Sequence, residues 1–363
     1  MVTYHHTKVK LLYAWYNNSI NTVNQGGSAM SIRSLSYFLT VAEELNITTA
    51  AQKLYITQQT LSSHIKRLED QYGVALFERR PKLRLTPAGE RMVHYATRIV
   101  RLERMMNSEF GDFSKKSGGV LLVGCSRIRA KYFFPEIWQA YQELCPNIEV
   151  RMKEGNSSRM DEYMLSRKVD LCISLNSSEQ LHLKKELLMH ESIYFVISIP
   201  LFEQYFGDRA VEKRREFTNG IRCQDILGIP LILQPDTNYI RRIINRHFMR
   251  LDVVPRAIFE SNDSELIFNM CLTSCGAALL PETTLFLPQG LDPQMLHGVY
   301  IFPLKDIRVS SVISYPVDME LPHYERVFID ICKDVFEEGR KKIENQKRLI
   351  LNSTITTSII SEE

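Results

Sequence analysis

Several signatures of common protein classes are missing from this sequence of 363 residues. No apolar stretch approaches the length of a transmembrane helix, and the segment IYFVISI at 193–199 has the length of a strand. The motifs GxGxxG, GxxxxGK(S/T), HExxH and GxSxG, which accompany nucleotide binding or catalysis, do not occur. We therefore expect a protein that is not an enzyme, has no cofactor and does not cross a membrane.

Cysteine and histidine are present, but not at the spacings that bind metals. None of the seven cysteines forms a CxxC pair, and we interpret all seven as reduced thiols in a cytoplasmic protein. Cys271 and Cys275 lie four residues apart, which we interpret as one face of a buried helix. The adjacent His5 and His6 lie in a segment without periodicity, and the other histidines are scattered. The sequence therefore predicts no metal site.

Charge is nearly balanced over the whole chain, but it is not evenly distributed. The formal net charge is +3. Residues 31–100 contain ten Lys and Arg against six Asp and Glu, a surplus of four that exceeds the whole-chain value. Because the remainder is about neutral, any polyanionic partner is expected to bind the N-terminal third.

The N-terminal third shows a run of short helices. Residues 1–29 have no sustained period, and we expect a disordered extension that ends near Met30, a candidate for the true initiator. Helical patterns follow at about 34–45, 49–54 and 58–71, and VALFERRPKLRLT then reads as two short strands about a basic turn. This order describes a winged helix-turn-helix, so double-stranded DNA is the expected partner.

The third of these helices carries the residues expected to read DNA. Its sequence, ITQQTLSSHIKRLE at 56–69, has an apolar stripe formed by Leu61, Ile65 and Leu68. Thr57 precedes the stripe as a suitable N-cap. Glutamine at the exposed tip can hydrogen-bond adenine, while serine, lysine and the basic turn can hold phosphates. The expected DNA-binding residues are Gln58, Gln59, Ser62, Ser63, Lys66, Arg79, Arg80, Lys82 and Arg84.

A long helix follows, and its pattern predicts a dimer. Thr86 is a suitable N-cap, and Glu90 suits the positive end of the helix dipole. Apolar residues then recur at spacings of three and four from Met92 to Phe113. Such a helix has too little to pack on locally, so pairing with a second copy is the expected solution. The segment SKKSGG at 114–119 has the composition of a linker.

From residue 120 the hydrophobic period changes to that of strands alternating with helices. Helical stretches at about 133–144, 158–167, 239–250, 263–275 and 323–338 separate strand-like segments. This alternation predicts a mostly parallel α/β region, and its length suits two similar subdomains with a cleft between them. Beyond residue 340 the last helix continues and then frays into a polar, β-branched tail without an assignable role.

The segment from LSYFLTVAEEL at 35–45 to LTPAGE at 85–90 resembles the DNA-binding domain of LysR-type transcriptional regulators. The matching elements are, in order, YF…VAEE, TAAQKL, ITQQTLSSHIKRLE, GVALFER and LTPAGE, and a weaker resemblance continues to about residue 335. The resemblance implies three domains: a winged helix-turn-helix at 30–87, a linker dimerisation helix and hinge at 88–117, and an α/β effector-binding domain at 118–339. The effector-binding domain would have two subdomains and be similar in fold to periplasmic binding proteins. An N-terminal extension at 1–29 and a tail at 340–363 flank these domains.

The resemblance also implies an effector site between the two subdomains. Hydroxyls and helix N-terminal N–H groups bind anions well, and Arg127 and Arg129 follow the first strand, which suggests an anionic small molecule. Ile128 stands where Thr is common in the family, and Ser274 stands where Gly is common. The family's pocket positions, carried over one by one together with the first arginine, are Ser126, Arg127, Asn156, Ser157, Thr237 and Asn238.

The function implied is regulation of transcription by a homo-oligomer, dimeric through the long helix and tetrameric through the effector-binding domains. It would bind a pseudo-palindromic promoter site under the control of a small molecule, with RNA polymerase as a possible further partner. Two alternatives stay open. One is a redox-sensing member of the same family, in which cysteines such as Cys223, expected in a polar loop, are the trigger. The other is an architectural DNA-binding protein, which would not need the α/β region.

Overall fold

Two compact units make up the chain, Met1–Asn107 and Ser108–Glu363, and helix α5 (Pro87–Ser114) begins in the first and ends in the second. The computed structural model describes residues 31–114, 119–176, 182–287, 298–317 and 320–360. The predicted N-terminal extension, with His5, His6 and Met30, lies outside these residues, as does most of the predicted linker at 114–119.

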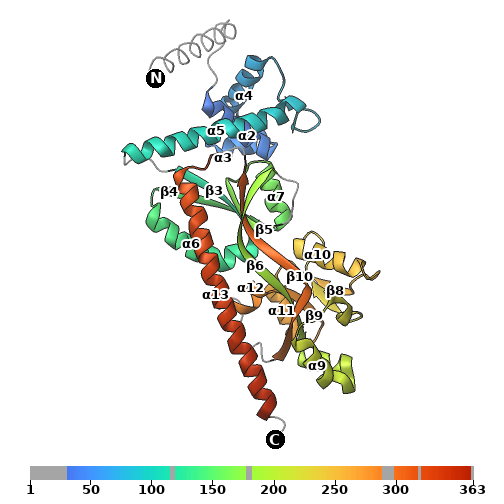
Figure 1. Cartoon of the computed structure of the whole chain (residues 1–363). Helices are drawn as coiled ribbons and strands as arrows, with labels where there is room; N and C mark the ends of the chain where they lie inside the picture. Colours follow the sequence, from blue (N-terminus) through green and yellow to red (C-terminus); the bar gives the residue numbers. More distant parts are fainter. Residues whose placement is uncertain (1–30, 115–118, 177–181, 288–297, 318–319, 361–363) are drawn as a thin grey trace, which may run out of the picture. The chain divides into compact units, whose positions relative to one another are not determined.

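Three short helices and a two-stranded wing precede α5 in the first unit (Figure 1). Thr57 Oγ1 accepts from the N–H of Thr60 at 3.1 Å, and Thr86 Oγ1 accepts from the N–H of Gly89 at 3.0 Å. Both predicted N-caps are therefore confirmed. The elements are α2 (Ile32–Glu44), α3 (Ile47–Lys53), α4 (Gln58–Tyr72), β1 (Phe77–Glu78) and β2 (Arg84–Leu85).

The core of the first unit is formed by the apolar stripes that the sequence shows. Leu61, Ile65 and Leu68 of α4 are buried against α2 residues such as Phe38. Gly89 brings α5 close to the chain before β1, because a Cβ there would lie 2.1 Å from the carbonyl oxygen of Leu76. Side-chain burial thus leaves the polar faces of α4 to the solvent.

An eight-stranded mixed sheet, in the order β4-β3-β5-β10-β6-β9-β7-β8, forms the second unit. At one end β3 is parallel to β4 and β5, and at the other β7 is parallel to β8 and β9. The long strands β6 and β10 are antiparallel to each other and join the two ends. The strands are β3 (Gly119–Ser126), β4 (Ile148–Gly155), β5 (Leu171–Leu175), β6 (Leu183–Ser198), β7 (Leu231–Leu233), β8 (Ala257–Glu260), β9 (Ala277–Pro281) and β10 (Val299–Pro316).

Helices cover both faces of this sheet. Ala278 and Leu280 of β9 enter one core with α6, α11, α12 and α13, whereas Ala277 and Leu279 enter another with α8, α9 and α10. We call β3–β5 with α6 and α7 the first lobe, and β7–β9 with α8 to α12 the second lobe. The helices are α6 (Arg127–Leu144), α7 (Ser157–Leu165), α8 (Ile199–Phe206), α9 (Ala210–Thr218), α10 (Tyr239–Met249), α11 (Ser264–Leu272), α12 (Glu282–Phe286) and α13 (His323–Ile360).

The two-part α/β architecture is confirmed, but three details of the prediction are wrong. The sheet is mixed, because β6 and β10 cross both lobes as antiparallel strands. Helices α8, α9 and α12 were not expected, since their short segments are strongly charged or follow a strand directly. Helix α13 does not fray soon after residue 340 but continues to Ile360.

Candidate nucleic-acid interface and ligand pocket

The N-terminal end of α4 is a polar surface on the side of the helix away from the core. Gln58, Gln59 and Lys66 are exposed, and Ser62 is half-buried. Exposed Ser63 accepts a hydrogen bond from the guanidinium of Arg67 at 3.2 Å. The glutamine amides therefore carry both donors and acceptors into solvent at the first turn, as base readout requires.

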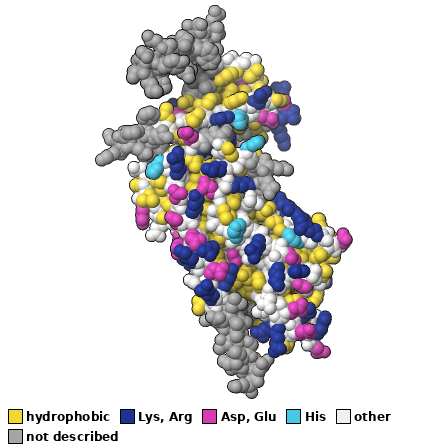
Figure 2. All heavy atoms as spheres, viewed as in Figure 1, with side chains coloured by type: hydrophobic (Ala, Val, Ile, Leu, Met, Phe, Trp, Pro, Cys, Tyr) yellow, Lys and Arg dark blue, Asp and Glu magenta, His cyan; other side chains and the backbone are white. Residues whose placement is uncertain are grey.

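The wing between β1 and β2 divides its four cations into two pairs. Arg79 lies 3.6 Å from Glu69, and Arg84 lies 2.5 Å from Glu78. Exposed ion pairs of this kind contribute little, so either arginine can exchange its carboxylate for a phosphate. Arg80 and Lys82 are exposed and have no ion-pair partner in the described part of the chain. Figure 2 shows basic side chains gathered over this wing.

His64 holds α4 against α2, and the sequence did not reveal this contact. Its Nδ1 lies 2.8 Å from Ser34 Oγ, and its ring meets the ring of Tyr37 edge to face at 4.9 Å. Burial, with Arg67 and Arg33 nearby, lowers the pKa of His64 below its ordinary value. The neutral imidazole thus fixes the orientation of the helix that carries the glutamines.

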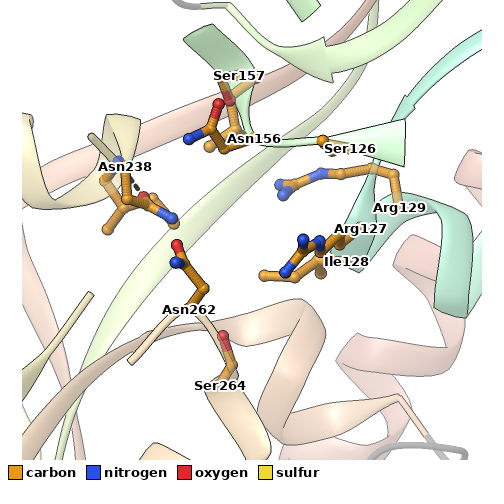
Figure 3. Close-up of a pocket in the computed structure, with 12 residues that line it drawn as sticks. Ser126, Arg127, Ile128, Arg129, Asn156, Ser157, Asn238, Asn262 and Ser264 are labelled. Carbon is orange, nitrogen blue, oxygen red and sulfur yellow. Dashed lines mark hydrogen bonds between the residues drawn. The ribbon is translucent and has the colours of Figure 1, made fainter. Parts of the chain in front are cut away.

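A pocket of about 110 Å³ lies between the two lobes (Figure 3). Of the six predicted residues, Ser126, Arg127, Asn156, Ser157 and Asn238 line it. Thr237 has its side chain outside the lining, although its carbonyl accepts from Asn156 Nδ2 and Ser158 Oγ, both at 3.4 Å. Figure 3 shows the two arginines on one side of the pocket and Asn238 with Asn262 on the other.

Four helices begin at the pocket, two from each lobe. The N-cap residues are Ser126, Asn156, Asn238 and Asp263, and the last three hydrogen-bond the first N–H groups of their own helices. Ser126 makes no such bond, and its buried Oγ has no hydrogen-bond partner among the residues that the structure describes. The positive ends of four helix dipoles and one unsatisfied hydroxyl therefore meet in a single pocket.

Asn262 and Ser264, which were not predicted, line the second-lobe side of the pocket. They flank Asp263, whose carboxylate accepts from the N–H groups of Glu265 and Leu266. A cluster of Asn, Asp and Ser before an apolar helical run is a recognisable N-cap signal, so the signal was present in the sequence.

Comparison with known proteins assigns both units to one family. Residues 32–90 match the bacterial regulatory helix-turn-helix protein model of the lysR family, and residues 114–337 match the LysR substrate binding domain. The chain belongs to the LysR family. It is thus a LysR-type DNA-binding transcriptional regulator by descent.

Relatives and solved structures of similar length agree with this assignment. The HTH-type transcriptional regulator BsdA of Bacillus subtilis is 27% identical over 307 residues, covering 83% of this chain and 100% of that protein. The probable nitrogen assimilation transcriptional activator of Synechococcus elongatus is 24% identical and covers 84% and 95%. A full-length OxyR variant from Pseudomonas aeruginosa has a TM-score of 0.61 at 20% identity, covering 84% and 98%. Full-length CbnR in complex with its target DNA has a TM-score of 0.52 at 18% identity, covering 84% and 100%.

In this LysR-family protein, the second predicted pocket cation is not available to a ligand. Arg129 is 2% exposed, and its guanidinium pairs with the carboxylate of Glu191, whose side chain is 0% exposed. Arg129 Nε also donates to Ser311 Oγ at 3.0 Å, and Glu191 accepts from Ser311 and from Thr283. Arg127, by contrast, is exposed and forms no ion pair with any described residue, so it is the cation that a pocket anion would meet.

The seven thiols are free, and most are buried. Burial raises the pKa of Cys172, Cys223 and Cys271 to about 12, so these groups are protonated at neutral pH. Cys223 lies in a buried 3₁₀ turn and not in a polar loop, and Cys275 is exposed beyond the end of α11 instead of sharing its buried face. Because the thiolate is the reactive form, these three buried thiols are poor candidates for a redox trigger.

The described residues carry neither a metal-binding cluster nor a membrane-spanning helix. Those residues contain no group of three or more His, Cys, Asp and Glu side chains that could hold a metal ion. None of the helices that they form is long and apolar enough to cross a membrane.

Proposed function

We propose that this LysR-type regulator binds a pseudo-palindromic promoter site as a homo-oligomer, through α4 and the wing, and that a small anion in the pocket modulates this binding. The main support for an anionic effector is that four helix N-termini, Arg127 and the unsatisfied hydroxyl of Ser126 lie around the same pocket. Each helix N-terminus carries roughly half a positive elementary charge, and Asp263 offsets only part of the total.

The size of the pocket limits the effector to a small molecule. A cavity of about 110 Å³ is below the roughly 300 Å³ of sites for drug-sized ligands. Three asparagines and three serines in the lining supply both donors and acceptors, so a carboxylate with additional polar groups is the class that fits best. Binding across both lobes would favour one relative placement of the lobes and so alter DNA binding.

Base readout can be tested by gel shift of the full chain on DNA from upstream of its own gene, with unrelated competitor DNA. Gln58→Ala should cost roughly 1–3 kcal/mol of specific binding, because an adenine loses two hydrogen bonds. Arg80→Ala should weaken all sequences alike and reduce the salt dependence, because it holds a phosphate. Gln71→Ala, an exposed glutamine at the far end of α4, is the matched control. If Gln58→Ala and Gln71→Ala bind equally well, Gln58 does not read the site.

Effector binding can be tested by calorimetric titration of the full chain with a panel of small carboxylates. At least one is expected to bind, and Arg127→Ala should weaken it by about 1.5–3 kcal/mol, the usual loss for a hydrogen bond to a charged group. Ser126→Ala should cost about 0.5–1.5 kcal/mol. Arg246→Ala, at an exposed position near the other end of α10, should leave the affinity unchanged. Silence across the whole panel would count against an anionic effector.

A further inference from the structure

Helix α13 extends past the part of the chain that resembles other LysR proteins. The match to the LysR substrate binding domain ends at residue 337, whereas the helix continues to Ile360. At Gly339 a Cβ would lie 2.5 Å from the ring of Phe133, which stacks on Phe336 with centroids 3.9 Å apart. Glycine therefore allows the helix to pass this stacked pair. We call residues 338–360 the extension.

The extension contacts both lobes of the second unit. Lys342 Nζ lies 2.6 Å from Glu136 Oε1 on α6, in the first lobe. Ile343, only 1% exposed, enters the main core. One turn further on, Lys347 Nζ lies 2.6 Å from Glu282 Oε2 on α12, in the second lobe. Figure 1 shows α13 passing both α6 and α12.

The ion pair between Lys347 and Glu282 is more buried than the other ion pairs of the extension. Its side chain is 15% exposed and that of Glu282 is 8% exposed, whereas the pairs formed by Arg340, Lys341 and Lys342 are between half-exposed side chains. The ammonium also lies 5.6 Å from the ring centroid of Tyr194 and 5.9 Å from that of Phe286. Lys347 Nζ also lies 3.2 Å from Glu344 Oε1 of its own helix, but that carboxylate is half-exposed, so Glu282 is the buried partner on which the charge depends.

Helix α12 connects this contact to the wall of the pocket. Thr283, the neighbour of Glu282, donates a hydrogen bond to Glu191, and Glu191 pairs with pocket-lining Arg129. Neighbouring residues of one short helix thus contact the extension, through Glu282, and the buried pair of the pocket wall, through Thr283.

We propose that Lys347 is a positioning residue that fastens the extension across both lobes and so holds α12, and through it the Glu191–Arg129 pair, in place. The consequence for effector binding rests on the proposed function, whereas the fastening of α12 does not. The fastening is therefore measured without any effector.

Amide hydrogen exchange of the full chain, followed by mass spectrometry on peptides that cover α12 and α6, tests the proposal. Lys347→Met, and a chain that ends at Asn345, should each speed exchange of the α12 amides by about tenfold or more, the loss expected when a hydrogen-bonded charge is released. Lys347→Arg should restore most of the protection. Lys341→Met, which removes an exposed pair with Glu338 on the same helix, should leave exchange at α12 unchanged.

Two results would overturn the proposal. One is wild-type exchange of α12 in the shortened chain, which would show that the extension does not hold this helix. The other is an equal rise over α6 and α12, which would show general destabilisation of the unit. If α12 behaves as expected but no carboxylate binds, the fastening stands and the effector proposal alone fails.

Discussion

Glu191→Gln is expected to lower the free energy of unfolding of the second unit by about 3–5 kcal/mol. Glutamine keeps the size of the side chain but removes its negative charge. The guanidinium then remains in a site where it is 2% exposed, without a counter-charge. Thr283 and Ser311 also lose a charged acceptor. Uncompensated burial of charge is among the most costly consequences of a single substitution.

Chemical unfolding in urea, followed by tryptophan fluorescence, measures this loss. Trp138 of α6 packs against the core of the second unit and reports on it alone once Trp15 is replaced by phenylalanine. The matched control is Glu149→Gln, which breaks an exposed pair with Arg151 at 2.7 Å. That change should cost less than about 1 kcal/mol. Equal effects of the two substitutions would mean that the buried pair has no special energetic role.

Arg129 lines the pocket as its position after the first strand suggested, but its buried partner Glu191 could not be predicted from the sequence. Arg127 and Arg129 lie two residues apart in one helix, and nothing in their local pattern shows which of the two forms an ion pair inside the protein. The difference is made by Glu191, which is distant in sequence and lies on a strand that crosses both lobes. Local sequence does not reveal a pairing over such a separation.

Prediction was most successful where local signals decide the structure. The stripe of Leu61, Ile65 and Leu68, with the caps at Thr57 and Thr86, predicted the helices of the first unit, and all five residues lie as expected. Each signal there depends on neighbours within a few residues.

The long strands β6 and β10 were predicted only in part, for a physical reason. The first half of β6, LKKELLMHE, mixes charged with apolar side chains, and of its nine residues only Met189 and Glu191 are buried, so it shows no clean alternation of apolar and polar residues. Between Leu304 and Arg308 the pairing of β10 with β6 shifts register, and this irregularity divides the strand into two segments in the sequence. Met189, Ile307 and Val309 of these regions are buried, but cross-strand pairing over long sequence separations, and not a continuous local pattern, sets the extent of the two strands.

Four of the five predicted residues that line the cavity share one property that sequence can show. Ser126, Asn156, Ser157 and Asn238 lie at or beside a helix N-cap, where polar side chains are favoured for local reasons. The cavity itself depends on the placement of two lobes, which no local pattern encodes. Ser274 is a second example of a contact that no local pattern shows. It adopts a left-handed φ of +61° at a position where the family commonly has Gly, and its Oγ lies 2.8 Å from Oγ of Ser198, which is distant in sequence.

Leu102→Glu is expected to prevent dimerisation through α5 and to weaken binding to a two-half-site DNA by about 100-fold or more. Within the first unit, α5 buries Ala96 and half-buries Ile99 against its own core. Tyr95, Leu102 and Met106 remain 56%, 56% and 49% exposed at spacings of seven and four, which places them on a second, uncovered stripe. A second copy of the helix would bury this stripe. In the resulting dimer, binding of one half-site would raise the effective concentration of the second DNA-binding domain at the other half-site and so increase the affinity.

Sedimentation equilibrium and gel shift on the same preparations separate assembly from DNA contact. Leu165→Glu, at a leucine that is 66% exposed at the end of α7, introduces the same charge on a different helix and should change neither mass nor affinity. Since Leu102 lies outside the recognition helix, Leu102→Glu should retain binding to a single half-site at the level of the wild-type half-site affinity. A Leu102→Glu protein with wild-type mass and full affinity would place the dimer contact on another surface, because a carboxylate facing its own copy across a dry interface is strongly unfavourable.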